Sequence, residues 1–337
     1  MKGINLNFLF LIFILPYLCL ITRLYSSKQD STLFLTEAST NNFTLQVKEI
    51  FELDITKNLK ANKFKKTTKI GLKVYTNSGA GICTPTHLTK DIINQLIEIG
   101  YLHENIFITD LDRNKLRECE YLPSLSNPEL FFHGVRVIPL LESNTLDTSW
   151  SYESPLPQNE KMNHEIHLES SFLFRAGLEL DRRSLLPAPL ILDTDFWINL
   201  PIFTDHYSLG LNGALLNGTL WNISNNDRFF LNPNSGNIGI AEIASIPELK
   251  DKWILNIGSL IRLQYIGGPE FNSLYNTDLN KLIVSTNPLC IDHYVLKLMN
   301  KNRIQNGFLP FEVPPYFKFA KNLGYKFESR DLVIKKF

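Results

Sequence analysis

Two acidic residues and one histidine stand where apolar segments of the chain end. Asp205 and His206 directly follow the apolar run 196–203, and Asp110 ends the run 105–110. A histidine at the end of a strand can act as a general base or as a metal ligand. Carboxylates beside it could orient a substrate or share a divalent metal ion. The same pattern also fits a histidine that only makes structural hydrogen bonds.

A third carboxylate, Asp292, lies in the first turn of a helix expected at 288–303, which Pro288 opens. An acid at that position is already explained by its favourable interaction with the helix dipole. Neither Ser-His-Asp nor Cys-His catalysis is supported, because no serine lies in a GxSxG motif.

A glycine-containing turn, Gly79–Thr84, precedes a second predicted helix at 87–100. The turn lacks the spacing of a P-loop and of a GxGxxG motif. It could still bind an anion at the N-terminus of the helix, where backbone N–H groups are unpaired. The alternative is an ordinary turn between a strand and a helix.

Strands and helices alternate along the chain around these residues. The segments 69–76, 105–110 and 134–141 are apolar and predict strands, with helices at 87–100 and 112–121 between them. This βαβαβ order predicts an α/β fold with a mostly parallel sheet flanked by helices, in one unit or two lobes. Sites in such folds usually form at the carboxyl ends of the strands. Further predicted elements are strands at 190–203, 253–260, 282–287 and 331–337 and helices at 209–216 and 314–325.

The ends and the middle of the chain predict its organisation. An almost continuous apolar run at 6–21 follows Lys2 and predicts a signal peptide or N-terminal membrane anchor over 1–26. A buried N-terminal helix is the alternative. Export would place the rest of the chain outside the cytoplasm, either membrane-anchored or, after cleavage, periplasmic or extracellular. Residues 27–65 then form a polar and basic tether, 66–337 the α/β domain, and 142–165 a lid-like loop.

Composition excludes several classes of protein. The 34 basic and 34 acidic residues balance to a net charge of zero, so nucleic acid is not expected as a partner. Hydrophobic residues make up 44% of the 337, which excludes a wholly disordered chain. The four cysteines show no CxxC and no metal-binding spacing. One disulfide is possible, but a disulfide framework is not.

Four segments in this order resemble the domain of unknown function 362 (DUF362) family, particularly its exported bacterial members. The resemblance covers about 69–337. The matching segments are KIGLKVYTNSGAGICTPTHLTKDIINQLIEIGYLHENIFITD, DFWINLPIFTDHYSLGLNGALLNGTL, IGGPEF and STNPLCID.

The resemblance implies a polar pocket at the strand ends. It marks His206, Asp110 and Asp292 as catalytic candidates, with His206 also a metal-ligand candidate. The ligand-binding candidates that it implies are Lys73, Thr84, Asp205, Asn217 and Gly268. Thr204, Leu216, Gly258 and Asn287 depart from the family pattern, in which lysines or acids stand at or near these positions. Some members carry appended iron–sulfur modules, and this chain lacks the cysteines for such a cluster.

Three functions follow from these observations. The protein binds a small polar or anionic ligand in a strand-end pocket. Alternatively it is an enzyme of unknown class, with a reaction assisted by a divalent metal as the first hypothesis, in which His206 is acid, base or metal ligand and Lys73 contacts an anion. In the third alternative it is a surface protein that recognises a partner through the 142–165 loop.

Overall fold

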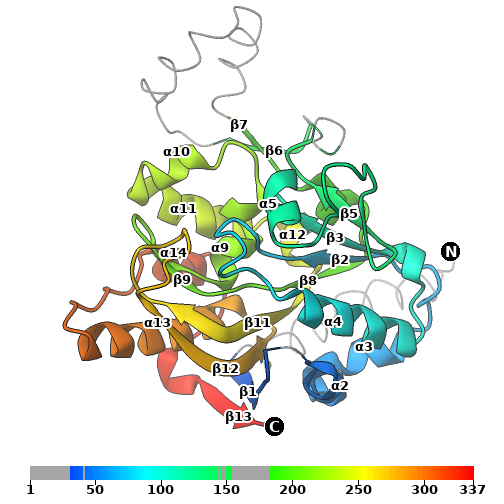
Figure 1. Ribbon diagram of the computed structural model, residues 1–337. Helices are drawn as coiled ribbons and strands as arrows, with labels where there is room; N and C mark the ends of the chain where they lie inside the picture. The colour runs from blue at the N-terminus through cyan, green and yellow to red at the C-terminus, as the bar shows by residue number, and fades with distance from the viewer. Residues whose placement is uncertain (1–30, 41, 143–144, 146, 148, 154–182) are drawn as a thin grey trace, which may run out of the picture.

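A nine-stranded mixed sheet organises the chain in the computed structural model (Figure 1). The structure describes residues 31–40, 42–142, 145, 147, 149–153 and 183–337. The strand order is β13-β1-β12-β11-β8-β2-β3-β5-β4. Its strands are β1 (Thr32–Glu37), β2 (Ile70–Lys73), β3 (Ile106–Asp110), β4 (Phe131–Phe132), β5 (Val135–Pro139), β8 (Phe196–Asn199), β11 (Trp253–Gln264), β12 (Asn276–Ser285) and β13 (Val333–Lys336).

The centre of the sheet is parallel. Strands β11, β8, β2, β3 and β5 run in one direction, and β12 is antiparallel to both β11 and β1. The mostly parallel α/β fold predicted from the sequence is therefore confirmed. Two short hairpins lie outside the sheet: β6 (Ser151–Glu153) with β7 (Arg183–Leu185), and β9 (Thr204–His206) with β10 (Gly210–Asn212).

Helices cover both faces of the sheet (Figure 1). One face carries α2 (Thr44–Glu52), α3 (Lys57–Ala61), α4 (Thr86–Glu98) and α5 (Arg113–Glu118). The other carries α8 (Ala188–Leu192), α9 (Ala214–Gly218), α10 (Asp227–Phe230), α11 (Pro233–Ala244), α12 (Pro247–Lys250), α13 (Pro288–Gln305) and α14 (Tyr316–Asn322). The two core clusters thus lie on opposite faces of one sheet, rather than in two lobes.

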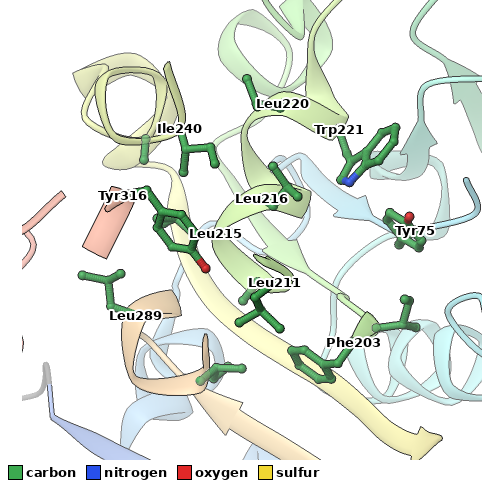
Figure 2. Close-up of a cluster of buried hydrophobic side chains, with 14 of the residues drawn as sticks. Tyr75, Phe203, Leu211, Leu215, Leu216, Leu220, Trp221, Ile240, Leu289 and Tyr316 are labelled. Atoms are coloured by element: carbon green, nitrogen blue, oxygen red, sulfur yellow. The ribbon is translucent and has the colours of Figure 1, made fainter. Parts of the chain in front are cut away.

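Figure 2 shows part of the core around α9. Leu215 and Leu216 of α9 pack with Leu211 from β10, Ile240 from α11 and Tyr316 from α14. All five are completely buried. Segments that are distant in sequence therefore meet around this short helix, and its position is fixed by apolar packing.

The polar tether predicted at 27–65 is wrong for the part that the structure describes. Strand β1 pairs with β12 on one side and β13 on the other. Leu33 and the α2 residues Val47, Ile50 and Phe51 are buried in the core. The Ser-, Thr- and Asn-rich composition of 26–45 gave no sign of a strand, because only the four central residues of β1 are buried.

The strand predicted at 190–203, which Asp193 and Asp195 interrupt, is wrong in its first part. The segment begins in the helix α8, which ends at Leu192, and the strand β8 covers only Phe196–Asn199. The apolar run before Asp193 is too short for its pattern to separate a buried helix from a buried strand. The predicted helix at 209–216 similarly divides into β10 and α9.

Most of the loop predicted as a lid, and the whole N-terminal segment 1–26, lie outside the described residues. The described part of the loop is anchored, since the hydroxyl of Tyr152 donates a hydrogen bond to Glu242 on α11. None of the helices in the described part of the chain has the length and apolar character needed to cross a membrane.

Candidate functional site

The chain changes direction across the sheet between β2 and β8. From β2 it proceeds through β3 to β5 on one side, and from β8 to β11 on the other. Such a switch point opens a crevice at the carboxyl ends of the strands, where α/β proteins commonly bind ligands. Lys73 ends β2 and Asn199 ends β8, so these side chains are positioned at the crevice.

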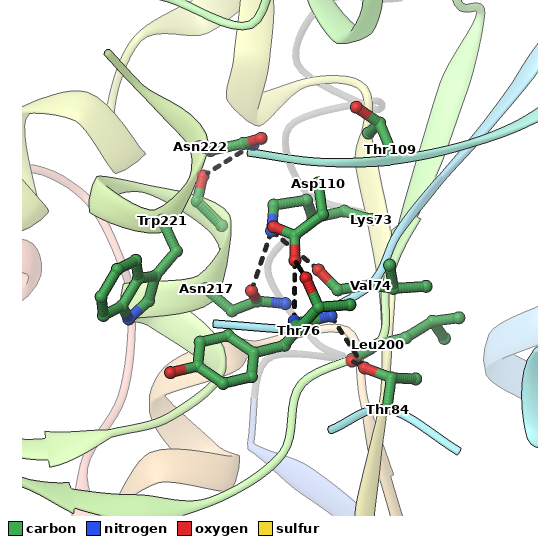
Figure 3. A network of polar contacts seen from close by, with 12 residues as sticks. Lys73, Val74, Thr76, Thr84, Thr109, Asp110, Leu200, Asn217, Trp221 and Asn222 are labelled. Carbon is green, nitrogen blue, oxygen red and sulfur yellow. Dashed lines mark hydrogen bonds and ion pairs between the residues drawn. The ribbon is translucent and has the colours of Figure 1, made fainter. Parts of the chain in front are cut away.

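A buried network fills the crevice around Lys73 (Figure 3). Its ammonium donates to Asp110 Oδ1 at 2.6 Å, to Asn217 Oδ1 at 3.0 Å and to the carbonyl of Val74 at 2.7 Å. Asp110 Oδ2 accepts from the N–H and the hydroxyl of Thr76, at 2.7 and 2.6 Å. Burial lowers the pKa of Lys73, and the charge of Asp110 opposes that shift.

The network continues through three asparagines across the sheet toward β12. Asn217 donates to Asn199 at 2.8 Å, and Asn199 donates to Asn256 on β11 at 2.9 Å. Asn256 also donates to the carbonyl of Ser285 on β12. Polar contacts therefore run from β3 to β12 through the interior, and every side chain in this series is buried.

Lys73 is not available as the anion contact that the sequence suggested. All three of its N–H donors are used inside the protein, and its side chain is fully buried. Thr84 is equally engaged: its hydroxyl accepts from the N–H of Tyr75 and donates to the carbonyl of Leu200. These two residues and Asn217 tie β2, β8 and α9 together.

Asp205 and Gly268 form a second buried contact. The N–H of Gly268 donates to Asp205 Oδ1 at 2.8 Å. A Cβ at position 268 would collide with the carbonyl oxygen of Asp205, so only glycine allows the two segments to approach this closely. Burial raises the pKa of Asp205, partly opposed by the hydrogen bond from Gly268. The pair joins the β9 turn to the 267–269 turn.

His206 lies in an aromatic environment. Its ring stacks on Tyr207 and tilts against Phe230, each with 4.8 Å between ring centroids. Nδ1 accepts from the N–H of Ser208 at 3.3 Å, while Nε2 is buried without a hydrogen-bond partner in the described part of the protein. Burial lowers the pKa of His206 to about 4, so the ring is neutral at neutral pH.

Asp292 caps the N-terminus of α9. It accepts from the N–H groups of Ala214 at 2.6 Å and Leu215 at 3.1 Å, and from the hydroxyl of Tyr316 at 3.3 Å. Burial raises its pKa to about 7, against the lowering effect of these hydrogen bonds. Its carboxylate therefore positions α9, and through α9 also Asn217.

The three catalytic candidates occupy three separate environments. Asp110 belongs to the lysine network, His206 to the aromatic cluster and Asp292 to the α9 cap. Among the residues that the structure describes, no three His, Cys, Asp or Glu side chains are grouped closely enough to hold a metal ion. The metal-ligand role suggested for His206 thus gains no partner ligands from the described residues.

A pocket of about 350 Å³ lies instead beside the crevice, at the N-terminus of α4. The Gly79–Thr84 turn forms one wall, and β11 and the end of α5 form others. Residues with polar groups on this pocket include Cys83, Thr86, His87, Glu118, Ser259 and Arg262. None of the eight residues proposed from the sequence lines it.

The first turn of α4 borders this pocket. Pro85 is the N-cap residue, and no side chain caps the helix. Thr86 and His87, the first two residues of α4, both line the pocket. The backbone N–H groups of a helix start favour a negative charge. The sequence pattern indicated this helix start as an anion-binding candidate. It did not indicate the other residues that line the pocket.

Arg262 gives the pocket a cation. Its Nε donates to Asp278 at 2.9 Å and its Nη1 to the carbonyl of Gly81 at 3.1 Å, which fixes the guanidinium against the turn. Glu118, on the same pocket, pairs with Lys115 at 3.1 Å. Nothing local in the sequence indicates Arg262, because strand pairing brings it to the turn from a position 181 residues away.

Two of the four positions that depart from the pattern of the family that the chain resembles have a local structural explanation. Asn287 caps α13 by accepting from the N–H of Leu289 at 3.0 Å. Gly258 leaves no room for a side chain, because a Cβ there would lie 2.6 Å from the ring of Phe203. Both positions therefore contribute to packing or capping in this chain.

No protein family model and no curated protein matches the chain. Among solved structures, it is similar to a Thermotoga maritima protein from the Northeast Structural Genomics Consortium, with 13% identity and a TM-score of 0.37. The match covers 80% of this chain and 60% of the other, so the chain spans less than two thirds of that protein.

Proposed function

We propose that the protein binds a small anionic ligand, bearing a carboxylate or phosphate group, in the pocket at the N-terminus of α4. The observation that carries the proposal is the convergence of two anion-binding features on one cavity. The uncapped start of α4 and the guanidinium of Arg262 both line it. A cavity of about 350 Å³ suits a small molecule rather than a macromolecule.

The buried lysine network supports this assignment, because it stabilises the segment that leads to the pocket. The lysine network satisfies its own charges internally and holds the carboxyl ends of β2 and β3 rigid. The chain passes from β2 through Thr76, which the network holds, to the Gly79–Thr84 turn, so the network also helps to position the start of α4. A preorganised set of donors binds an anion with a smaller entropic cost than a mobile set.

The test is calorimetric titration of the full chain with inorganic phosphate and with succinate. Saturable binding is expected for at least one of them. Arg262→Gln should weaken it about tenfold or more, because a hydrogen bond to a charged group contributes about 1.5–3 kcal/mol. Arg330→Gln is the matched control, since that arginine is exposed and does not line the pocket.

A second variant separates the helix terminus from the arginine. Thr86→Pro removes one N–H donor, and proline is well tolerated at the first position of a helix. Weaker binding with an unchanged melting temperature would support the role of the α4 terminus. The absence of saturable binding to either anion, or an Arg262→Gln variant that binds like the wild type, would contradict the proposal.

An enzymatic role using His206, Asp110 and Asp292 is not favoured by any contact among them. Membership of the DUF362 family and export from the cytoplasm are further proposals, supported by the four ordered segments and by the apolar run 6–21. Cell fractionation with N-terminal sequencing of the mature protein tests the second. Recovery of an intact N-terminus in the cytoplasmic fraction would contradict it.

A further inference from the structure

Two cysteines far apart in the sequence meet beside the ligand pocket. Cys83 belongs to the turn before α4, and Cys119 is the C-cap residue that directly follows α5. Both residues line the same pocket, and the neighbouring Cys83 is the main cause that raises the pKa of the Cys119 thiol. Both cysteines are reduced in the structure. The sequence showed no cysteine motif because the fold brings the two residues together.

The two thiols differ in their access to solvent. Cys83 is partly exposed at the pocket, whereas Cys119 is only 3% exposed and its Sγ lies 3.6 Å from the carbonyl of Thr76. The neighbouring Cys83 and burial both raise the pKa of the Cys119 thiol. Since the thiolate is the reactive form, Cys83 is the better placed of the two to attack an external sulfur.

We propose that Cys83 and Cys119 form a redox-active dithiol site, which reacts with low-molecular-weight disulfides and closes to an intramolecular disulfide. This activity goes beyond anion binding and does not depend on it. The site consists of one accessible sulfur, one buried sulfur beside it, and a cavity through which a small disulfide can enter. Oxidation would join the start of α4 to the end of α5.

The reaction balances in two exchange steps. The Cys83 thiol loses its proton, and its sulfur attacks one sulfur of the external disulfide. That disulfide bond breaks, a mixed disulfide forms on Cys83, and one small thiolate leaves and takes up a proton. Cys119 then loses its proton and attacks the Cys83 sulfur, releasing the second small thiol. The protein loses two hydrogen atoms, and the external disulfide is reduced to two thiols.

The experiment incubates the reduced full chain with oxidised glutathione and measures intact mass and free thiols after denaturation. The expected product has lost two hydrogen atoms and two of its four thiols. Peptide mapping should place the bond between Cys83 and Cys119. Treatment with dithiothreitol should restore the starting mass.

Two substitutions test the order of attack. Cys119→Ala should accumulate a glutathione adduct on Cys83, because the resolving sulfur is missing. Cys83→Ala should give neither that adduct nor an intramolecular disulfide at Cys119. Cys290→Ala is the matched control, since Cys290 lies in the core cluster on the opposite face of the sheet and should not alter the product. Melting curves of the reduced variants establish that each one folds.

The proposal is overturned by either of two outcomes. One is an unchanged mass and thiol count in folded wild-type protein after prolonged incubation with oxidised glutathione. The other is a disulfide that maps to Cys19 or Cys290 instead of the proposed pair. Neither readout involves phosphate or succinate, so failure here leaves the anion-binding proposal untouched, and the reverse also holds.

Discussion

Lys73 Nζ lies 2.6 Å from Asp110 Oδ1, and both side chains are completely buried. A buried ion pair gains little net stability from its own attraction, because removing both charges from water is costly. Removing only one of the two charged groups destabilises the protein much more, since the remaining charge has no partner. The main role of the pair is therefore to fix the carboxyl ends of β2 and β3 relative to each other.

Lys73→Met should lower the free energy of unfolding by about 3–5 kcal/mol, the usual cost of leaving a buried charge unpaired. Asp110→Asn should also destabilise the protein. The double variant should lose clearly less than the sum of the two, because neither charge remains. Urea unfolding of all four proteins measures this coupling. Additive losses would show that the two side chains act independently.

Asp292 predicts stability that falls as the pH rises. Its pKa is raised to about 7 in the folded protein, above the ordinary value of 3.8. The folded state thus binds more protons than the unfolded state between those values. The contribution of this group is full below pH 3.8 and is lost as the pH rises toward 7, with a limiting slope of about 1.4 kcal/mol per pH unit.

Asp292→Asn should remove this dependence while weakening the cap of α9, because the amide cannot accept on both sides. The expected cost at low pH is about 1–3 kcal/mol. Unfolding midpoints measured from pH 4 to pH 8 check both effects. A variant that keeps the wild-type difference between pH 4 and pH 7 would show that another group titrates there.

His206 predicts the opposite trend over an overlapping range. Its folded pKa is about 4 and its ordinary value 6.5, so the unfolded state binds more protons between them. The stability it contributes is full above pH 6.5 and is lost as the pH falls toward 4. His206→Phe preserves an aromatic ring beside Tyr207 and Phe230. The variant should lose stability less steeply than the wild type on acidification, measured by the same unfolding series.

The titrations of Asp292 and His206 change stability in opposite directions, so the two variants should differ in the pH dependence of their stability. Between pH 4 and 6.5, Asp292→Asn should become more stable as the pH rises, and His206→Phe should become less stable. Parallel profiles for the two variants would contradict the assignment of either group.

The central fold could be predicted because local pattern and topology agree there. Apolar runs bounded by turns located β2, β3 and β5, and the periodicity at 87–100 located α4 within two residues at each end. The first strand could not be found in the same way. Only four of its residues are buried, and its partners β12 and β13 lie about 250 residues or more later in the chain.

The candidate site was predicted less well than the fold, and for a physical reason. Polar residues at strand ends suggest a pocket, but the sequence does not show whether their hydrogen bonds are satisfied internally. Lys73, Asp110 and Asn217 do come together, yet they satisfy one another's hydrogen bonds. The groups that remain available, Arg262 and the two thiols of Cys83 and Cys119, are assembled by long-range contacts that leave no local pattern.

The N-terminal strand supplies the last prediction. Leu33 lies on β1, between β12 and β13, and its side chain is fully buried in the core. Leu33→Ala should therefore lower the free energy of unfolding by about 2–5 kcal/mol, the range for a leucine lost from a packed core. Leu45→Ala is the matched control, because Leu45 lies on the nearby helix α2 with 62% of its surface exposed and should change stability by less than about 0.5 kcal/mol. Urea unfolding of both variants distinguishes the two possibilities. Equal and small losses of stability would mean that residues 32–37 are a tether. A large loss for Leu33→Ala alone would mean that they are an integral strand of the sheet.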